Sequence, residues 1–335
     1  MRDELTHARA RYEARPDALE VFLRRRDRRQ RARKLGTAVF ALAVGLAAIA
    51  VVFAIAAVEV PDRGPTGAGT DTAGSGAGKI VFSRWSEGEW HLYSVNEDGS
   101  GEQQLTDGAR DFYADISPDG TKIVAETELP GIDGLLVMNV DGTDPVTFSL
   151  GYANEPSWSP DGSRIAFAMD SGGGTCCLTL WVINADGSGL ARLGDVRGSS
   201  PTWSPDGSKI AFLMSGERLE DARSLAVMNV DGTDVTPISE PGWWGGTPDW
   251  SPDGASILAT LDRGLTDGAL LTIPADGGEA RVIERLPVLG RASWSRDGAQ
   301  VTYVSKGQVW VMDADGSNTH PVTALGGNVE NPTWG

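Results

Sequence analysis

The chain has 335 residues, a formal net charge of −17 at pH 7 and a hydrophobic content of 40%. This length would allow two average domains, although a single all-β body can use as much sequence. Its two cysteines are the adjacent Cys176 and Cys177, and this number excludes a fold that depends on a framework of several disulfide bonds.

An uncharged segment of 23 residues begins at Gly36 and ends at Val58. As an α-helix rising ~1.5 Å per residue it would be ~34 Å long, enough to cross the hydrocarbon core of a bilayer. We therefore predict a single transmembrane helix over residues 36–58, preceded by a basic stub over residues 1–35. A cleaved secretion signal is the alternative, because Ala54 and Ala56 are small residues with the spacing of a cleavage site.

The charges on either side of this segment predict its orientation. A run of basic residues precedes it, whereas Glu59, Asp62 and Arg63 follow it. Because cationic flanks resist translocation, we expect a cytoplasmic N-terminus and an extracytoplasmic location for the chain after Val58. After Leu35 the sequence has 17 basic and 40 acidic residues, so the exported part is strongly acidic. The basic run is explained by orientation and contact with anionic lipid, and we expect no nucleic-acid partner.

Residues 59–78 are rich in Gly, Thr, Ser and Pro and have almost no apolar side chains to bury. This composition predicts a flexible linker between the membrane and the rest of the chain.

Residues 79–335 repeat one short pattern six times. Asp-Gly pairs recur every 39 to 45 residues, at Asp98, Asp141, Asp186, Asp231, Asp276 and Asp315. A second series recurs with a similar spacing, at Ile116, Trp158, Trp203, Trp250, Trp294 and Trp334. A period of this length is typical of small sheets stacked around an axis. The repeats therefore predict an all-β fold, a six-bladed β-propeller of four-stranded antiparallel blades, with the second series buried between blades.

One copy illustrates the predicted blade. Apolar and β-branched segments separated by turn formers predict strands over residues 201–204, 209–213, 225–229 and 235–238. Ser-Pro-Asp-Gly turns join first to second strands, because Pro presets φ and Gly accepts an unusual backbone conformation. These turns begin at Ser117, Ser159, Ser204 and Ser251, and Arg296 replaces the proline in a further copy. The Asp-Gly pairs predict primed hairpin turns between third and fourth strands.

The short turns lie at one end of the blades, which we call the uniform face. The longer connections lie at the opposite end, which we call the variable face and where we expect binding. The repeat beginning at Lys79 lacks a first strand, and the final sequence ENPTWG supplies one. We therefore predict that the two ends of the repeat region pair in one blade and close the ring.

The sequences PSWSPDGSRIAF, PTWSPDGSKIAF and LAVMNVDGTD resemble the repeats of TolB-type six-bladed propellers. The resemblance covers residues 79–335 and implies the fold. Relatives of this kind include periplasmic interaction proteins and the propeller domains of some serine peptidases and polysaccharide lyases, so the resemblance does not by itself assign an activity.

Catalytic and metal-binding patterns are scarce. The chain has no Gly-x-Ser-x-Gly nucleophile elbow, and His91 and His320 fall in different repeats, where we expect packing or surface roles. The segments 139–144 and 229–234 are rich in Asn and Asp, but they coincide with the repeated hairpin turns and lack the longer ligand loop of a calcium site. We therefore predict no catalytic residue, no metal site and no cofactor.

Aromatic residues in the variable loops are candidate contacts for a ligand. Trp243 and Trp244 occur in the segment PGWWGG, and further aromatic residues fall in or beside comparable loops, namely Trp85, Trp90, Phe112, Tyr113 and Tyr152. Packing over the blade ends is the alternative. The positions three residues before the second series should form a polar ring around the channel mouth. They are Tyr113, Glu155, Ser200, Thr247, Arg291 and Asn331.

These observations predict a single-pass cell-membrane protein with an extracytoplasmic propeller. We expect it to bind a protein or cell-envelope component through the variable face, without chemistry of its own. The alternative is a glycan- or peptide-processing enzyme of the cell envelope, with Glu155 and neighbouring carboxylates acting at the channel mouth.

Overall fold

The computed structural model describes residues 78–335 except 108–109, 130–131, 171–177, 217–222, 243, 262–267, 286–289 and 325–327. Every element within these ranges is a β-strand. No helix long and apolar enough to cross a membrane occurs in this part of the chain. The predicted stub, the transmembrane helix and all but the last residue of the linker lie outside the described residues, as do Trp243, Cys176 and Cys177.

The described residues form a propeller of antiparallel sheets. One sheet joins both ends of the repeat region, in the order β23 (Asn328–Trp334), β1 (Lys79–Ser86), β2 (Glu89–Asn96) and β3 (Gln103–Gln104). Another comprises β4 (Arg110–Ile116), β5 (Lys122–Leu129), β6 (Ile132–Asn139) and β7 (Val146–Ser149). A third comprises β15 (Trp244–Trp250), β16 (Ser256–Leu261), β17 (Ala269–Pro274) and β18 (Arg281–Glu284). A fourth comprises β19 (Ser293–Trp294), β20 (Gln300–Ser305), β21 (Gln308–Asp313) and β22 (His320–Pro321).

The remaining strands form a seven-stranded sheet. It contains β8 (Ala153–Trp158), β9 (Arg164–Asp170), β10 (Leu178–Asn184), β11 (Ala191–Trp203), β12 (Lys209–Met214), β13 (Ser224–Asn229) and β14 (Thr236–Pro237). Strand β11 pairs with β10 through residues 191–197 and with β12 through residues 198–203. The sequence predicted a longer connection from the fourth strand of one blade to the first strand of the next, whereas here the chain passes from one pairing to the other as a continuous strand.

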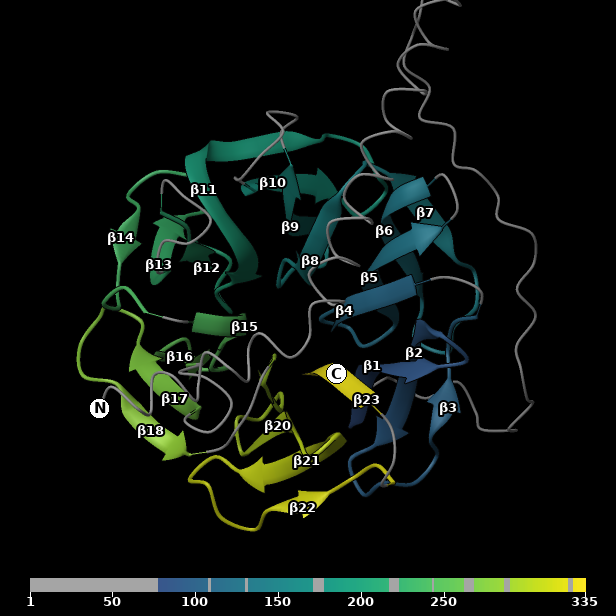
Figure 1. Cartoon of the computed structure of the whole chain (residues 1–335). Helices are drawn as coiled ribbons and strands as arrows, with labels where there is room; N and C mark the ends of the chain where they lie inside the picture. The colour runs from purple at the N-terminus through teal and green to yellow at the C-terminus, as the bar shows by residue number, and fades with distance from the viewer. Residues whose placement is uncertain are drawn as a thin grey trace, which may run out of the picture. The chain divides into compact units, whose positions relative to one another are not determined.

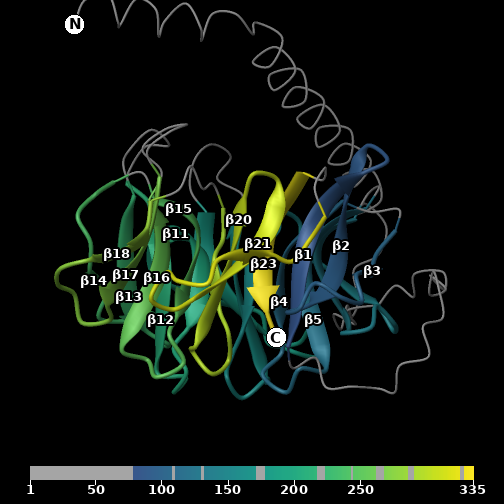
Figure 2. The same ribbon diagram turned by 90° about the horizontal axis from the view of Figure 1, so that it is seen from below.

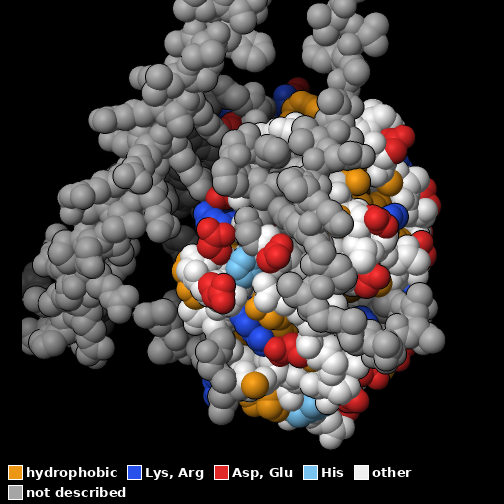
Figure 3. Space-filling model, turned by 90° about the vertical axis from the view of Figure 1, so that its right-hand side faces the viewer, with side chains coloured by type: hydrophobic (Ala, Val, Ile, Leu, Met, Phe, Trp, Pro, Cys, Tyr) orange, Lys and Arg blue, Asp and Glu red, His pale blue; other side chains and the backbone are white. Residues whose placement is uncertain are grey.

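The sheets surround a central axis, with β4, β8, β15 and β23 nearest to it and β3, β7, β14, β18 and β22 at the periphery (Figure 1). The strands run between the two ends of the ring (Figure 2). Apolar cores lie between neighbouring sheets, as where Val137 and Phe148 of one sheet pack with Trp158 and Phe167 of the next. Most members of the second repeat series are buried in such cores, as predicted, and only Trp294 is half-buried. Acidic and basic side chains are interspersed on the side of the propeller that Figure 3 shows.

The predicted ring closure is confirmed. Strand β23 pairs with β1, with Trp334 opposite Ile80. The Gly335 amide donates to the Lys79 carbonyl at 2.9 Å, and the Gly78 amide donates to the Gly335 carbonyl at 3.3 Å. Both ends of the repeat region therefore contribute strands to one sheet.

The Ser-Pro-Asp-Gly turns form as predicted. In the turn that begins at Ser117, the Gly120 amide donates to the Ser117 carbonyl at 2.8 Å, and Gly120 has a φ of +72°. The Ser117 hydroxyl donates to Asp119 Oδ1 at 2.6 Å and accepts the Lys122 amide at 2.9 Å. The serine and aspartate side chains of the turn thus form hydrogen bonds within the turn and with the first residue of the next strand.

The prediction of primed turns at the Asp-Gly pairs is wrong. Gly142 has a φ of +88°, but Asp141 is not in the left-handed region. The Gly142 amide donates to the Asn139 carbonyl and the Asn139 amide donates to the Thr143 carbonyl, which defines a three-residue loop ending in a glycine bulge. Asp141 Oδ1 accepts both the amide and the hydroxyl of Thr143, and this interaction fixes the aspartate in the turn.

Candidate functional site

The strands nearest the axis share a bulge about midway along their length. Their pairing shifts register at Tyr113, at Glu155, at Ser200 and at Asn331, and all four residues have φ between +48° and +56°. Proline follows three of the four, and a bulge tolerates proline because no ladder hydrogen bond is needed there. Four of the six members of the predicted polar ring are therefore bulge residues in strained backbone conformations, and Thr247 and Arg291 are not.

Arg291 links two sheets that are not neighbours in the ring. Its side chain is only 3% exposed. Nη1 donates to the Ala114 carbonyl at 2.8 Å, and Nη2 lies 3.0 Å from Asp115 Oδ1. Asp115 also accepts the Thr333 hydroxyl of the intervening β23 at 3.4 Å. The predicted channel-mouth residue is thus a buried structural cation that ties three sheets together.

Carboxylates near the axis accept backbone amides from the next inner strand. Asp115 Oδ2 accepts the Trp158 amide and Asp249 Oδ2 accepts the Trp294 amide, each at 2.8 Å. Glu155 Oε2 accepts the Ser200 amide, also at 2.8 Å. Each bond crosses from one inner strand to the next, so these side chains hold successive inner strands in register.

Burial changes the acidity of these carboxyl groups. Burial raises the pKa of Asp249 to about 6, although Arg291 and the Trp294 amide act in the opposite direction. Burial likewise raises the pKa of Glu155 above its ordinary value, against the hydrogen bonds from Ser200. The axis therefore holds carboxyl groups that ionise less readily than those on the surface.

A row of aromatic rings leads from the β1–β2 hairpin at the variable face towards the axis. Trp85 is 42% exposed, and its ring lies 5.7 Å from that of Trp90 in an edge-to-face arrangement. The Trp90 ring lies 5.5 Å from that of Phe112, which in turn lies 6.4 Å from the Tyr113 ring. We call these four residues the aromatic row. It crosses from the β1–β2 hairpin to β4 and ends at the bulge residue Tyr113.

Both flanks of the aromatic row carry charge. The Arg110 guanidinium lies 5.2 Å from the Phe112 ring centroid and pairs with Glu128 at 2.7 Å. At the inner end, burial raises the pKa of the Tyr113 hydroxyl, and the negative charges of Glu155, Glu126 and Glu330 raise it further. The inner end is therefore acidic and holds a neutral phenol.

The other predicted contact residues are less exposed than expected. Trp244 is half-buried, packs against the apolar core between β13 and β17, and donates its Nε1 hydrogen to the Glu240 carbonyl at 3.2 Å. Tyr152 is half-buried and contributes to the electrostatics of Tyr113. Asn331 is 3% exposed, and its Nδ2 has no hydrogen-bond partner among the described residues. The structure thus brings Tyr113, Tyr152 and Glu155 together and places Trp244 against a core.

Asp115 and Asp249 were not among the residues predicted from the sequence. Each directly precedes a member of the second repeat series, two positions after a member of the predicted polar ring. Side chains two apart share one face of a strand, so this spacing could have placed both carboxylates at the axis.

The described residues contain no group of three or more His, Asp, Glu or Cys side chains that could hold a metal ion. In the segment considered for calcium, the Thr143 hydroxyl bond lowers the pKa of Asp141, and the turn accounts for the position of its carboxylate.

Comparisons with known proteins identify relatives of this architecture. A family model described as TolB beta propeller domain matches residues 144–335. TolB from Acinetobacter baumannii superposes with a TM-score of 0.67 at 17% identity, over 78% of this chain and 67% of that chain. A chain of a nidogen/laminin complex superposes with a TM-score of 0.60 at 11% identity, over 76% of this chain and 97% of that chain. An oligogalacturonate lyase in complex with manganese superposes with a TM-score of 0.50 at 17% identity, over 73% of this chain and 74% of that chain. These identities show a shared fold alone. No curated protein matches the chain.

Proposed function

The chain belongs to the TolB beta propeller family, and from this premise we propose that it is a scaffold that binds a protein or another cell-envelope component without chemistry of its own. The aromatic row is the observation that carries the proposal. Large amphipathic rings ending at an exposed tryptophan are typical of protein contact surfaces. The polar residues at the axis, by contrast, are occupied in bonds between strands.

We also infer that the ring has six four-stranded blades. Strand β11 is then shared, with residues 191–197 completing one blade and residues 198–203 beginning the next. Six apolar clusters among the described residues support this count, because each draws its side chains from two adjacent blades.

The proposed location follows from the sequence. The uncharged segment over residues 36–58 would anchor the protein in the cell membrane, with the basic stub in the cytoplasm. The propeller would then lie outside the cytoplasm at the end of a linker, with its variable face free to meet a partner.

Photo-crosslinking tests the proposed binding surface. The full chain would carry p-benzoylphenylalanine in place of either Trp85 or Val282 and be irradiated in its native membrane. Both positions are 42% exposed, but Val282 lies on the peripheral strand β18 away from the aromatic row. We expect a discrete crosslinked product from position 85 that Trp90→Ala reduces several-fold, and none from position 282. The same product from both positions, or none from position 85, would contradict the proposal.

A second candidate is an enzyme that acts on a glycan or peptide at the channel mouth. It is favoured by Glu155, whose raised pKa beside Tyr113 suits a proton donor. Incubation of the full chain with cell-wall glycan, envelope peptides and oligogalacturonate tests it. Turnover that Glu155→Gln abolishes without lowering stability would replace the scaffold proposal with this one.

A further inference from the structure

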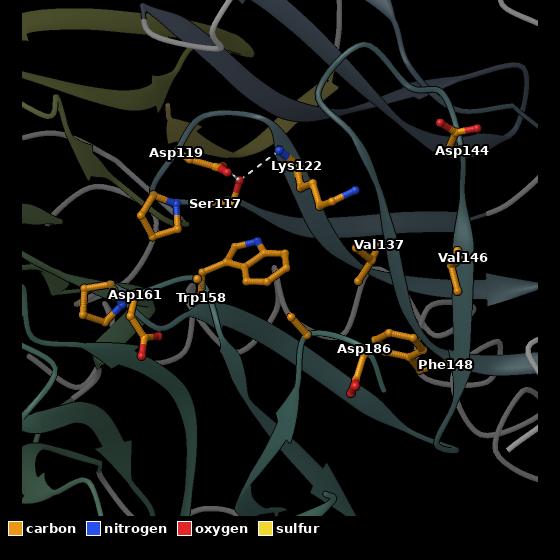
Figure 4. Close-up of a pocket in the computed structure, with 14 residues that line it drawn as sticks. Ser117, Asp119, Lys122, Val137, Asp144, Val146, Phe148, Trp158, Asp161 and Asp186 are labelled. Atoms are coloured by element: carbon orange, nitrogen blue, oxygen red, sulfur yellow. Dashed lines mark hydrogen bonds between the residues drawn. The ribbon is translucent and has the colours of Figure 1, made fainter. Parts of the chain in front are cut away.

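An open groove lies on the uniform face between the β4–β7 blade and strands β8–β10. Its volume is about 660 Å³. The side chain of Trp158 lies in its middle, with Val146 and Phe148 on one side (Figure 4). Val146 is 39% exposed, and Pro118 and Pro160 of two Ser-Pro-Asp-Gly turns add further apolar surface. We call this the Trp158 groove.

Negative charge predominates around these apolar walls. One basic side chain and four exposed acidic side chains line the groove, namely Lys122, Asp119, Asp144, Asp161 and Asp186. The ammonium of Lys122 donates to Asn139 Oδ1 at 3.2 Å, a bond within its own blade. The groove therefore suits a long side chain that has an apolar stem and a cationic head.

The next interface in the ring shows such a side chain in the equivalent place. Arg164 follows its Ser-Pro-Asp-Gly turn at the same spacing as Lys122, and Trp203 is the counterpart of Trp158. The Arg164 guanidinium carbon lies 4.8 Å from the Trp203 ring centroid. The adjacent Asp161 has its pKa lowered to about 2 by hydrogen bonds from Ser159 and Ser163, and the charge of Arg164 acts in the same direction. A guanidinium is thus accommodated over the buried tryptophan of an interface with an acidic rim.

A second groove repeats this composition between the blade that contains β12 and β13 and the β15–β18 blade. Its volume is about 520 Å³, and Trp250, Lys209 and three aspartates line it. As in the Trp158 groove, lysine stands where the intervening interface has arginine. Both grooves thus have a lysine, and not an arginine, beside their buried tryptophan.

We infer that the Trp158 groove binds an arginine side chain of a partner polypeptide, with the guanidinium against Trp158 and between the carboxylates of Asp119 and Asp161. Arginine is favoured over lysine because its planar head stacks on indole and is more weakly hydrated. This site is on the uniform face, at the opposite end of the ring from the aromatic row, so it extends the proposed function and does not depend on it.

Fluorine NMR of the full chain labelled with 5-fluorotryptophan tests the inference. The chain has 11 tryptophans, and Trp158→Phe assigns the relevant signal. The probes are the capped tripeptides Gly-Arg-Gly, Gly-Lys-Gly and Gly-citrulline-Gly. We expect the arginine peptide to shift the Trp158 signal in a saturable manner, and the uncharged citrulline peptide to bind about tenfold more weakly or not at all.

Two sets of variants test the geometry. In Lys122→Arg, the new guanidinium should lie over Trp158 in the way that Arg164 lies over Trp203. It should therefore compete with the peptide and weaken its binding about tenfold. The matched control Lys209→Arg changes only the second groove and should leave the Trp158 response unaltered. Asp119→Asn and Asp161→Asn keep side-chain shape while removing charge, and together they should weaken binding several-fold.

Three results would overturn the inference. They are equal responses to the arginine and citrulline peptides, no saturable response of Trp158, or Lys122→Arg binding as tightly as the parent chain.

Discussion

Asp249 is a buried carboxyl group whose ionisation opposes folding. Its pKa in the folded chain is about 6, above the 3.8 of an unperturbed aspartate, and desolvation is the main cause. Between these two values the folded chain binds more protons at this site than the unfolded chain does. The contribution of Asp249 to stability is therefore fully present below pH ~4 and is lost as the pH rises to ~6.

We expect Asp249→Asn to remove this pH dependence. Asparagine keeps an oxygen that can accept the Ser293 hydroxyl and the Trp294 amide, but it carries no charge. A shift of about two pKa units corresponds to at most about 3 kcal/mol. Urea unfolding between pH 4 and pH 6.5 should show the parent chain losing up to this much stability relative to the variant.

Asp206→Asn is the matched control for Asp249. Hydrogen bonds from Ser204 and Ser208 lower the pKa of Asp206 to about 2. Its contribution is present above pH ~4 and is lost only as the pH falls towards 2. The control should therefore behave like the parent chain between pH 4 and pH 6.5. Equal pH profiles for Asp249→Asn and the parent chain would contradict the proposed role of burial.

Among the elements, the Ser-Pro-Asp-Gly turn depends on its glycine for backbone conformation alone. Gly162 has a φ of +67°, and a Cβ placed there would meet its nearest atom, Pro118 Cδ, at 3.9 Å. Space is available, so the cost of a side chain comes from the left-handed backbone. We expect Gly162→Ala to lower the free energy of unfolding by about 1–2 kcal/mol, measured by urea denaturation.

Gly162→Asn separates backbone strain from contact. Asparagine adopts the left-handed region more readily than alanine although it is larger. The asparagine variant should therefore be the more stable of the two. A greater loss for asparagine would show that side-chain bulk, and not φ, limits this turn.

At the scale of the whole molecule, ring closure depends on the last strand. Trp334 is 8% exposed and packs with Ile80, Phe82 and Val311 in the core between the first and last sheets. Deletion of residues 331–335 removes this tryptophan and the pairing of Ile80 and Val81 with β23. Loss of a buried tryptophan alone costs about 3–5 kcal/mol.

We expect this deletion to lower the Tm of the full chain by about 10 °C or more, measured by calorimetry. Val282→Ala, at an exposed position of β18, serves as the control and should change stability by less than about 0.5 kcal/mol. An unchanged Tm for the deletion would show that the β1–β23 pairing does not stabilise the ring.

The repeat spacing by itself determined the all-β propeller, the strands over residues 209–213 and 225–229 and the pairing of Trp334 with the strand that begins at Lys79. These features follow from local turn chemistry and from apolar periodicity, both of which are present in each copy. The sequence also placed Tyr113, Glu155, Arg291 and Asn331 on one ring, because they share a position in the repeat.

Only the tertiary structure decided what these residues do. Arg291 is separated from Asp115 by 176 positions, and their ion pair exists because the closed ring brings non-adjacent sheets together at the axis. The aromatic row and the Trp158 groove likewise join side chains from different sheets. Local patterns describe one strand or turn at a time, so contacts between blades, and the desolvation that raises the pKa of Asp249, arise only when the ring is assembled.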